Sequence, residues 1–173
     1  MKKDLISPTG TSRVNIFWFR RDLRLHDNAG LYYALKEKIP VLPIFIFDKN
    51  ILDELDDNND RRLEFINQAL EGIQSSLNQI GSTLDVRYGF PVEVFKNLLD
   101  EYSIQKVFTN RDYEPYARER DAAIEELLKS SAPACMRRHM QPVDYGQCQR
   151  LRSLGRRPSP QPLFFPNSPT FAT

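Results

Sequence analysis

Residues 14–28 read VNIFWFRRDLRLHDN, a stretch whose character changes after its sixth residue. Val14–Phe19 is an apolar run of strand length, which is typical of a buried strand. Arg20–Asn28 then carries three arginines, two aspartates and a histidine. Either Asp27 or Asn28 can cap a helix that follows. The stretch therefore predicts a buried strand, a charged loop and a helix, which is the opening unit of an α/β fold.

The same alternation continues along the chain. The expected strands are 14–19, 41–47, 83–88 and 105–109, and the expected helices cover 28–35, 60–81, 91–99 and 115–128. Short connections between these elements predict a Rossmann-like, doubly wound parallel sheet of three layers, with helices on both faces. In such sheets ligands bind beyond the carboxyl ends of the strands, where the strand order reverses. The charged loop after the first strand falls at that edge.

A change of composition follows Ser130. Residues 131–173 contain no lysine, glutamate or isoleucine, but seven of the twelve prolines and six arginines. This composition predicts coil. We therefore expect one domain at 13–130 and a disordered Pro/Arg-rich tail at 131–173, with a fifth strand after Leu128 missing or replaced by the tail. The tail is either a non-native, vector-encoded or out-of-frame extension, or a native linker.

Charge, hydropathy and cysteine content narrow the class of protein. A net charge of +1 gives no reason to expect nucleic-acid binding by this chain. No apolar run approaches the roughly eighteen residues of a membrane span, and no apolar signal region follows Met1-Lys2-Lys3. The cysteines, Cys135 and Cys148, both lie in the last quarter of the chain. These features predict a cytoplasmic protein without a disulfide framework in residues 1–134.

Sequence motifs assign neither a metal site nor a catalytic residue. The two histidines lie more than a hundred residues apart, and the cysteines fall in the tail. Neither a nucleophile motif nor a phosphate-binding glycine loop is present in the sequence.

Three segments together resemble the DNA photolyase and cryptochrome family. They are WFRRDLRLHDN at 18–28, FIFDKNIL at 45–52 and NRDYEPYARERD at 110–121. The resemblance covers about residues 13–130 and implies the family's N-terminal α/β domain, which holds an antenna chromophore. In the family a larger C-terminal helical domain, joined in cis, holds catalytic FAD and receives the pyrimidine dimer of UV-damaged DNA. That domain has no counterpart in this chain.

The resemblance implies the antenna domain of a deoxyribodipyrimidine photolyase, a carbon–carbon lyase that repairs DNA with light. The fragment alone is expected to be inactive. Two alternatives are the N-terminal domain of a cryptochrome photoreceptor and a free-standing nucleotide-binding α/β module. An isolated domain would also expose apolar surface that the helical domain covers, which predicts some self-association.

The candidate cofactor-binding residues share positions at or just beyond the ends of strands. They are the cations Arg20 and Arg21, the apolar residues Phe47, Ile51 and Leu52, and the carboxylates Asp48, Asp112 and Glu114. Carboxylates can accept hydrogen bonds from the ring N–H groups of a flat pigment, and apolar residues can pack against the faces of its ring. An arginine can pair with its anionic tail. The groups after the second and fourth strands resemble those of members that bind 8-hydroxy-5-deazaflavin.

Other observations bear on the choice of pigment and on these assignments. Folate-binding members carry a polar and an acidic residue where this chain has Tyr116 and Ala117, so 8-hydroxy-5-deazaflavin or FMN is favoured over methenyltetrahydrofolate. The loop arginines and aspartates have a structural alternative, ion pairs that brace the loop. Asp112 and Glu114 also have a structural alternative, in which they are solvated or cap the last helix. Residues 118–121 are expected on a solvated helix face, although the resemblance makes one buried ion pair plausible.

Overall fold

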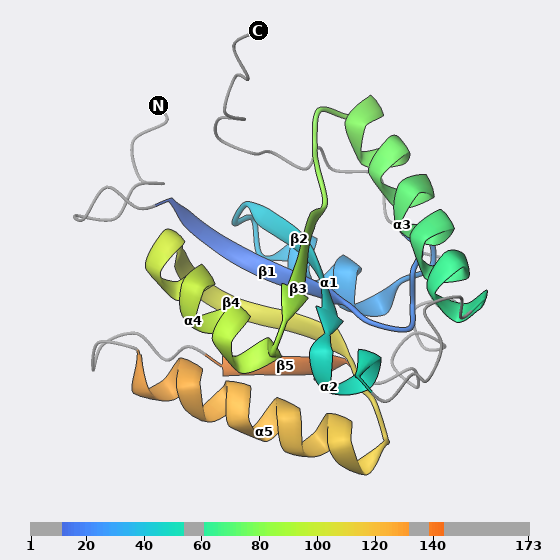
Figure 1. Cartoon of the computed structure of the whole chain (residues 1–173). Helices are drawn as coiled ribbons and strands as arrows, with labels where there is room; N and C mark the ends of the chain where they lie inside the picture. Colours follow the sequence, from blue (N-terminus) through green and yellow to red (C-terminus); the bar gives the residue numbers. More distant parts are fainter. Residues whose placement is uncertain (1–11, 54–60, 132–138, 144–173) are drawn as a thin grey trace, which may run out of the picture.

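A parallel β-sheet covered by helices on both faces forms the domain. The computed structural model describes residues 12–53, 61–131 and 139–143. In chain order the elements are β1 (Arg13–Phe19), α1 (Ala29–Lys36), β2 (Val41–Asp48), α2 (Lys49–Leu52), α3 (Arg61–Gln79), β3 (Asp85–Gly89), α4 (Pro91–Glu101), β4 (Ser103–Asn110), α5 (Pro115–Ser130) and β5 (His139–Val143). The strand order is β3-β2-β1-β4-β5, and every pairing is parallel (Figure 1).

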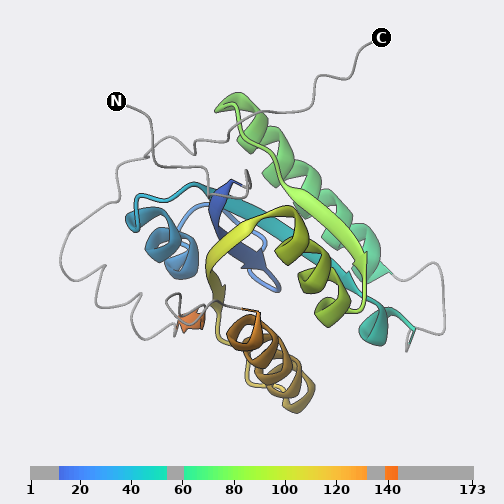
Figure 2. The same cartoon turned by 90° about the vertical axis from the view of Figure 1, so that its left-hand side faces the viewer.

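Each face of the sheet has its own hydrophobic core, because side chains along a strand point alternately to opposite faces. In β1, Ile16 and Trp18 pack on the side of α4 and α5, whereas Phe17 and Phe19 pack on the side of α1 and α3. Figure 2 shows β3 and β5 at opposite margins of the sheet. The predicted three-layer, doubly wound α/β fold is thus confirmed.

Local sequence accounts for where three of the helices begin. The side chain of Asn28 accepts a hydrogen bond from the backbone N–H of Leu31 and so caps α1. Pro91 and Pro115 occupy the first turns of α4 and α5, where a missing N–H costs nothing. The predicted helix and strand boundaries agree with the structure to within a few residues. The four-residue helix α2, capped by Asp48, was not predicted.

The prediction that the folded domain ends near residue 130 is wrong. His139–Val143 forms β5 and pairs in parallel with β4, and Met140 is buried in the core on the α5 side. The composition did not predict this strand, because the strand is short and its pairing partner lies about thirty residues earlier in the chain. The remainder of the predicted tail, 132–138 and 144–173, lies outside the described residues.

Candidate functional site

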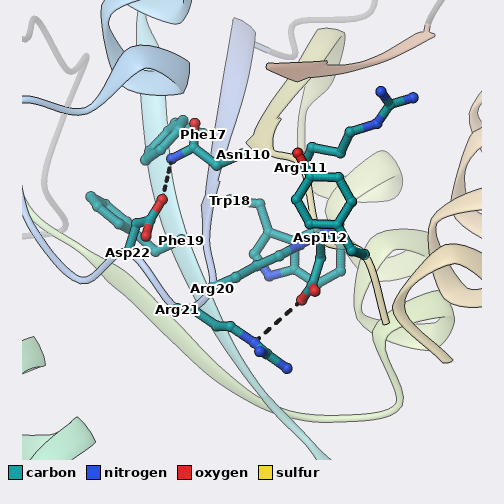
Figure 3. A pocket seen from close by; sticks show the side chains of 10 residues that line it. Phe17, Trp18, Phe19, Arg20, Arg21, Asp22, Asn110, Arg111 and Asp112 are labelled. Carbon is teal, nitrogen blue, oxygen red and sulfur yellow. Dashed lines mark hydrogen bonds and ion pairs between the residues drawn. The ribbon is translucent and has the colours of Figure 1, made fainter. Parts of the chain in front are cut away.

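The strand order reverses between β1 and β4, at the edge where ligands bind in doubly wound sheets. The loops that follow these two strands flank a cavity of about 180 Å³. Figure 3 shows its lining side chains, which come from Phe17–Asp22 and from Asn110–Tyr113. The predicted ligand edge is therefore hollowed at this point, although the cavity is smaller than the roughly 300–1,000 Å³ of most ligand pockets.

Asn110, at the end of β4, ties the charged loop to the sheet. Its amide nitrogen donates to a carboxylate oxygen of Asp22 at 2.9 Å and to the side-chain oxygen of Asn28 at 3.0 Å. Its amide oxygen accepts from the backbone N–H of Gly30 at 3.0 Å. A Cβ on Gly30 would lie 2.8 Å from that oxygen, so this close approach requires glycine. The loop after β1 is consequently held at both ends by one side chain.

A buried group of charges lies beside this cavity, and we call Trp18, Arg20, Asp48, Arg120 and Asp121 the Trp18 cluster. One Nη atom of Arg20 donates to Asp121 at 2.9 Å, and Arg120 donates to Asp48 at 3.2 Å. Both guanidinium groups lie over the Trp18 ring, at 4.2 and 4.8 Å from its centroid. Burial lowers the pKa of Arg20, and its hydrogen bond to Asp121 opposes that shift. The cluster joins β1 and β2 to α5.

Asp48 is engaged within the chain through both carboxylate oxygens. Oδ1 accepts from the backbone N–H of Asn50 at 3.1 Å, and Oδ2 accepts from the hydroxyl of Tyr116 at 2.7 Å as well as from Arg120. Burial raises the pKa of Tyr116, and donation to Asp48 raises it further. The residue that resemblance placed against a pigment thus connects α2 with α5.

Three of the other predicted residues form an ionic group at the mouth of the loops that flank the cavity, and two of them, Arg21 and Asp112, line it. The guanidinium of Arg21 pairs with Asp112 at 3.5 Å and with Glu114. The Arg21 and Glu114 side chains are 65% and 59% exposed. Hydrogen bonding to Glu114 raises the pKa of Arg21. We call Arg21, Asp112 and Glu114 the rim; the Glu114 carboxylate is exposed, whereas the Asp112 side chain is 14% exposed and lines the cavity.

The apolar candidates do not share one wall with the rim. Phe47 points to the α3 side of the sheet, opposite to its neighbour Asp48. Ile51 is 47% exposed on α2, and Leu52 is partly buried. The eight predicted residues therefore form three groups, namely the rim, the Trp18 cluster with Arg20 and Asp48, and the apolar positions.

The sequence did not lead us to assign three residues of this site, namely Tyr116, Arg120 and Asp121. Arg120 was expected on a solvated face, but its side chain is 8% exposed. The buried ion pair that the resemblance made plausible is confirmed. A signal was available, because Tyr116, Arg120, Ile124 and Leu128 recur every four residues and so share the buried stripe of α5.

Two further observations concern the described residues as a set. They contain no group of three or more His, Cys, Asp or Glu side chains placed to hold a metal ion. Among the helices in that part of the chain, none combines the length and apolar character needed to cross a membrane.

The fold defines a doubly wound α/β domain, with a charged crevice at the switch point where sheets of this class bind ligands. Comparison with known proteins gives the family. The model for DNA photolyase matches residues 15–143. The chain belongs to the DNA photolyase family and is the N-terminal domain of the photolyase and cryptochrome proteins.

Individual relatives of both kinds are similar to the chain. Cryptochrome-2 of Gallus gallus is 37% identical over 124 residues, covering 72% of this chain and 21% of that protein. The deoxyribodipyrimidine photo-lyase of Synechococcus sp. is 34% identical over 116 residues, covering 67% and 24%. The structure of an archaeal photolyase from Sulfolobus tokodaii with two FAD molecules superposes with a TM-score of 0.65 at 30% identity, covering 76% and 29%. The chain thus spans about a quarter of the length of these relatives.

Proposed function

We propose that this domain binds the antenna chromophore of a deoxyribodipyrimidine photolyase, and that the chromophore is a deazaflavin or a flavin. The observation that supports this most directly is the rim, in which the exposed groups of Arg21 and Glu114 and the cavity-lining carboxylate of Asp112 lie together at the switch point. Carboxylates accept hydrogen bonds from ring N–H groups, and a guanidinium binds an anionic tail. The structure of the Sulfolobus photolyase holds two FAD molecules and implies a novel light-harvesting cofactor, which supports a flavin as the pigment proposed for this chain.

The geometry fits part of such a ligand. The cavity of about 180 Å³ accepts the edge of a ring rather than a whole tricyclic ring, so the rest of the pigment would lie outward over the rim. Asp112, Glu114 and Arg21 would contact it. When bound, the pigment supplies absorption of light. Asp48 and Arg20 would act by holding α5 and β1 in place, since both carboxylate oxygens of Asp48 and both Nη atoms of Arg20 already have partners in the chain.

Tyr116 supports the preference for a flavin-type pigment over methenyltetrahydrofolate. Its hydroxyl donates to Asp48 and accepts from the side chain of Asn50 at 2.8 Å. The resemblance places a polar residue at this position in folate-binding members. In this chain the Tyr116 hydroxyl instead connects α2 with α5. Its neighbour Ala117 is buried and offers no acidic group.

A fluorescence titration of the chain with 8-hydroxy-5-deazaflavin, FMN and methenyltetrahydrofolate tests the proposal. We expect saturable binding of one of the first two pigments, weakened at least tenfold by the double change Asp112→Asn with Glu114→Gln. Glu125→Gln is the matched control, because Glu125 also makes an exposed ion pair on α5, with Lys129, but far from the rim. Absence of binding by a chain that circular dichroism shows to be folded would refute the proposal.

For the whole protein we propose light-driven repair of pyrimidine dimers in DNA, with FAD held by a C-terminal domain and cytoplasmic residence. A cryptochrome photoreceptor is the second candidate, because relatives named cryptochrome reach 37% identity and the photolyase named above 34%. Exposure of dimer-containing DNA to the full-length protein under blue light separates the two. Loss of dimers supports the photolyase, and their persistence with FAD bound supports the cryptochrome.

A further inference from the structure

β3 is an edge strand with one open side. Within residues 12–53, 61–131 and 139–143 it pairs with β2 alone, and it stands at the near margin of the sheet in Figure 1, with α3 and α4 to either side. An edge strand presents unpaired backbone N–H and C=O groups, which can pair with another strand. Val86 and Tyr88 on this strand are 46% and 63% exposed. Apolar side chains and unpaired backbone thus coincide on one edge.

The two faces of β3 carry different chemistry. Val86 and Tyr88 pair with Phe45 and Phe47 of β2 and so face the α3 side. Asp85 and Arg87 face the α4 side. Arg87 donates to Asp85 at 3.0 Å and to Glu101 of α4 at 2.9 and 2.6 Å.

The order of these side chains is self-complementary. Residues 84–88 read LDVRY, which places an acidic and a basic residue symmetrically about a central valine. We propose that a second copy of the chain pairs with this strand in antiparallel fashion, across a twofold axis at Val86, to join two sheets into one. Asp85 of each copy then lies opposite Arg87 of the other, and the two Val86 side chains meet. Opposite-charge and β-branched cross-strand pairs of this kind stabilise antiparallel strands.

The charges select this register over its neighbours. Centring the pair on Asp85 opposes two carboxylates, and centring it on Arg87 opposes two guanidinium groups, both of which are unfavourable. A shift by one residue between the strands sets Val86 opposite a residue of the other face, which separates the apolar groups. Of these registers, the one centred on Val86 is the one that satisfies both the charges and the faces.

The surface beside β3 has room for the partner's aromatic side chain. In the proposed register Tyr88 of one copy lies opposite Leu84 of the other. Leu84 and Val86 line an open groove of about 550 Å³ between β3 and α3, whose far wall includes Gln74 and Asn78. The groove can therefore receive the phenol ring, with amide groups within reach of its hydroxyl. An isologous contact of this kind closes as a dimer rather than growing into a fibre.

Sedimentation velocity of the 173-residue chain over a range of concentrations tests the proposal. We expect a reversible monomer–dimer equilibrium, with the dimer dissociation constant raised at least tenfold by Val86→Lys, since an edge lysine opposes strand pairing. Ile80→Lys is the matched control, a change at a 53% exposed apolar residue of the α3 end that we expect to leave the equilibrium unchanged. A monomer at every concentration, or equal effects of the two changes, would overturn the proposal.

A charge exchange tests the register itself. Arg87→Glu alone sets carboxylates opposite each other, and Asp85→Arg alone sets guanidinium groups opposite each other, so each variant should dimerise at least tenfold more weakly. A mixture of the two variants restores every opposite-charge pair and should form the heterodimer. Circular dichroism confirms that each variant is folded; if either is not, the comparison of Val86→Lys with Ile80→Lys decides. A folded mixture that stays monomeric would contradict the register. This inference is independent of the chromophore proposal.

Discussion

Replacement of Asp48 by alanine separates a structural role of this residue from a ligand role. The change leaves the Arg120 guanidinium buried without its partner, because the two side chains are 4% and 8% exposed and lie 3.2 Å apart. Removing one member of a buried ion pair costs about 3–5 kcal/mol. Loss of the cap of α2 adds about 0.5 kcal/mol, the low end of the usual range, because this helix has only four residues. We expect the free energy of unfolding to fall by about 4 kcal/mol.

Equilibrium unfolding in urea, followed by circular dichroism, measures this change. Glu125→Ala is the control, because its pair with Lys129 is exposed and should contribute less than about 0.5 kcal/mol. The double change Asp48→Leu with Arg120→Met removes both charges and should recover at least half of the loss, since an apolar pair often replaces a buried ion pair at little cost. A loss below about 1 kcal/mol for Asp48→Ala would refute the reasoning, because the burial of Arg120 would then carry no penalty.

Three further predictions concern stability. Gly30→Ala should destabilise the domain by about 1–3 kcal/mol in urea unfolding, because the new Cβ would lie 2.8 Å from the Asn110 side chain; unchanged stability would contradict the close approach. Asn15→Leu should raise the unfolding free energy by about 1 kcal/mol, because neither polar atom of this fully buried side chain has a hydrogen-bond partner among the residues that the structure describes, and a decrease would show that the amide is satisfied. The bond to Arg87 lowers the pKa of Glu101, so the stabilisation from this pair should be complete above the unfolded pKa of 4.5 and lost as the pH falls through the lower folded value. Thermal unfolding of Glu101→Gln should show less dependence on pH in that acidic window than the unaltered chain.

Local pattern was sufficient for most of the fold. Apolar runs of strand length predicted β1 and β2, the alternation of strands and helices predicted β3 and β4, and the apolar stripe of α3 predicted that helix. Each of these signals lies within a few neighbouring residues. β5 was not predicted, because a five-residue strand near the start of the Pro/Arg-rich segment is defined by its pairing with β4 rather than by its own pattern. The charged loop and the two strand-end motifs also located the edge that holds the cavity.

The sequence by itself thus determined the α/β class, the three layers and the edge where a ligand would bind. Only the tertiary structure decided which charges face solvent and which face one another. Asp48 and Arg20 lie more than seventy residues from Arg120 and Asp121, so no local pattern pairs them, and their burial under α5 depends on how that helix packs. The alternation of a strand likewise separated Phe47 from Asp48, which are adjacent in sequence and on opposite faces of the sheet. The sequence shows the chemical type of each side chain, whereas the partner of that side chain and its burial depend on contacts between segments that are distant in the sequence.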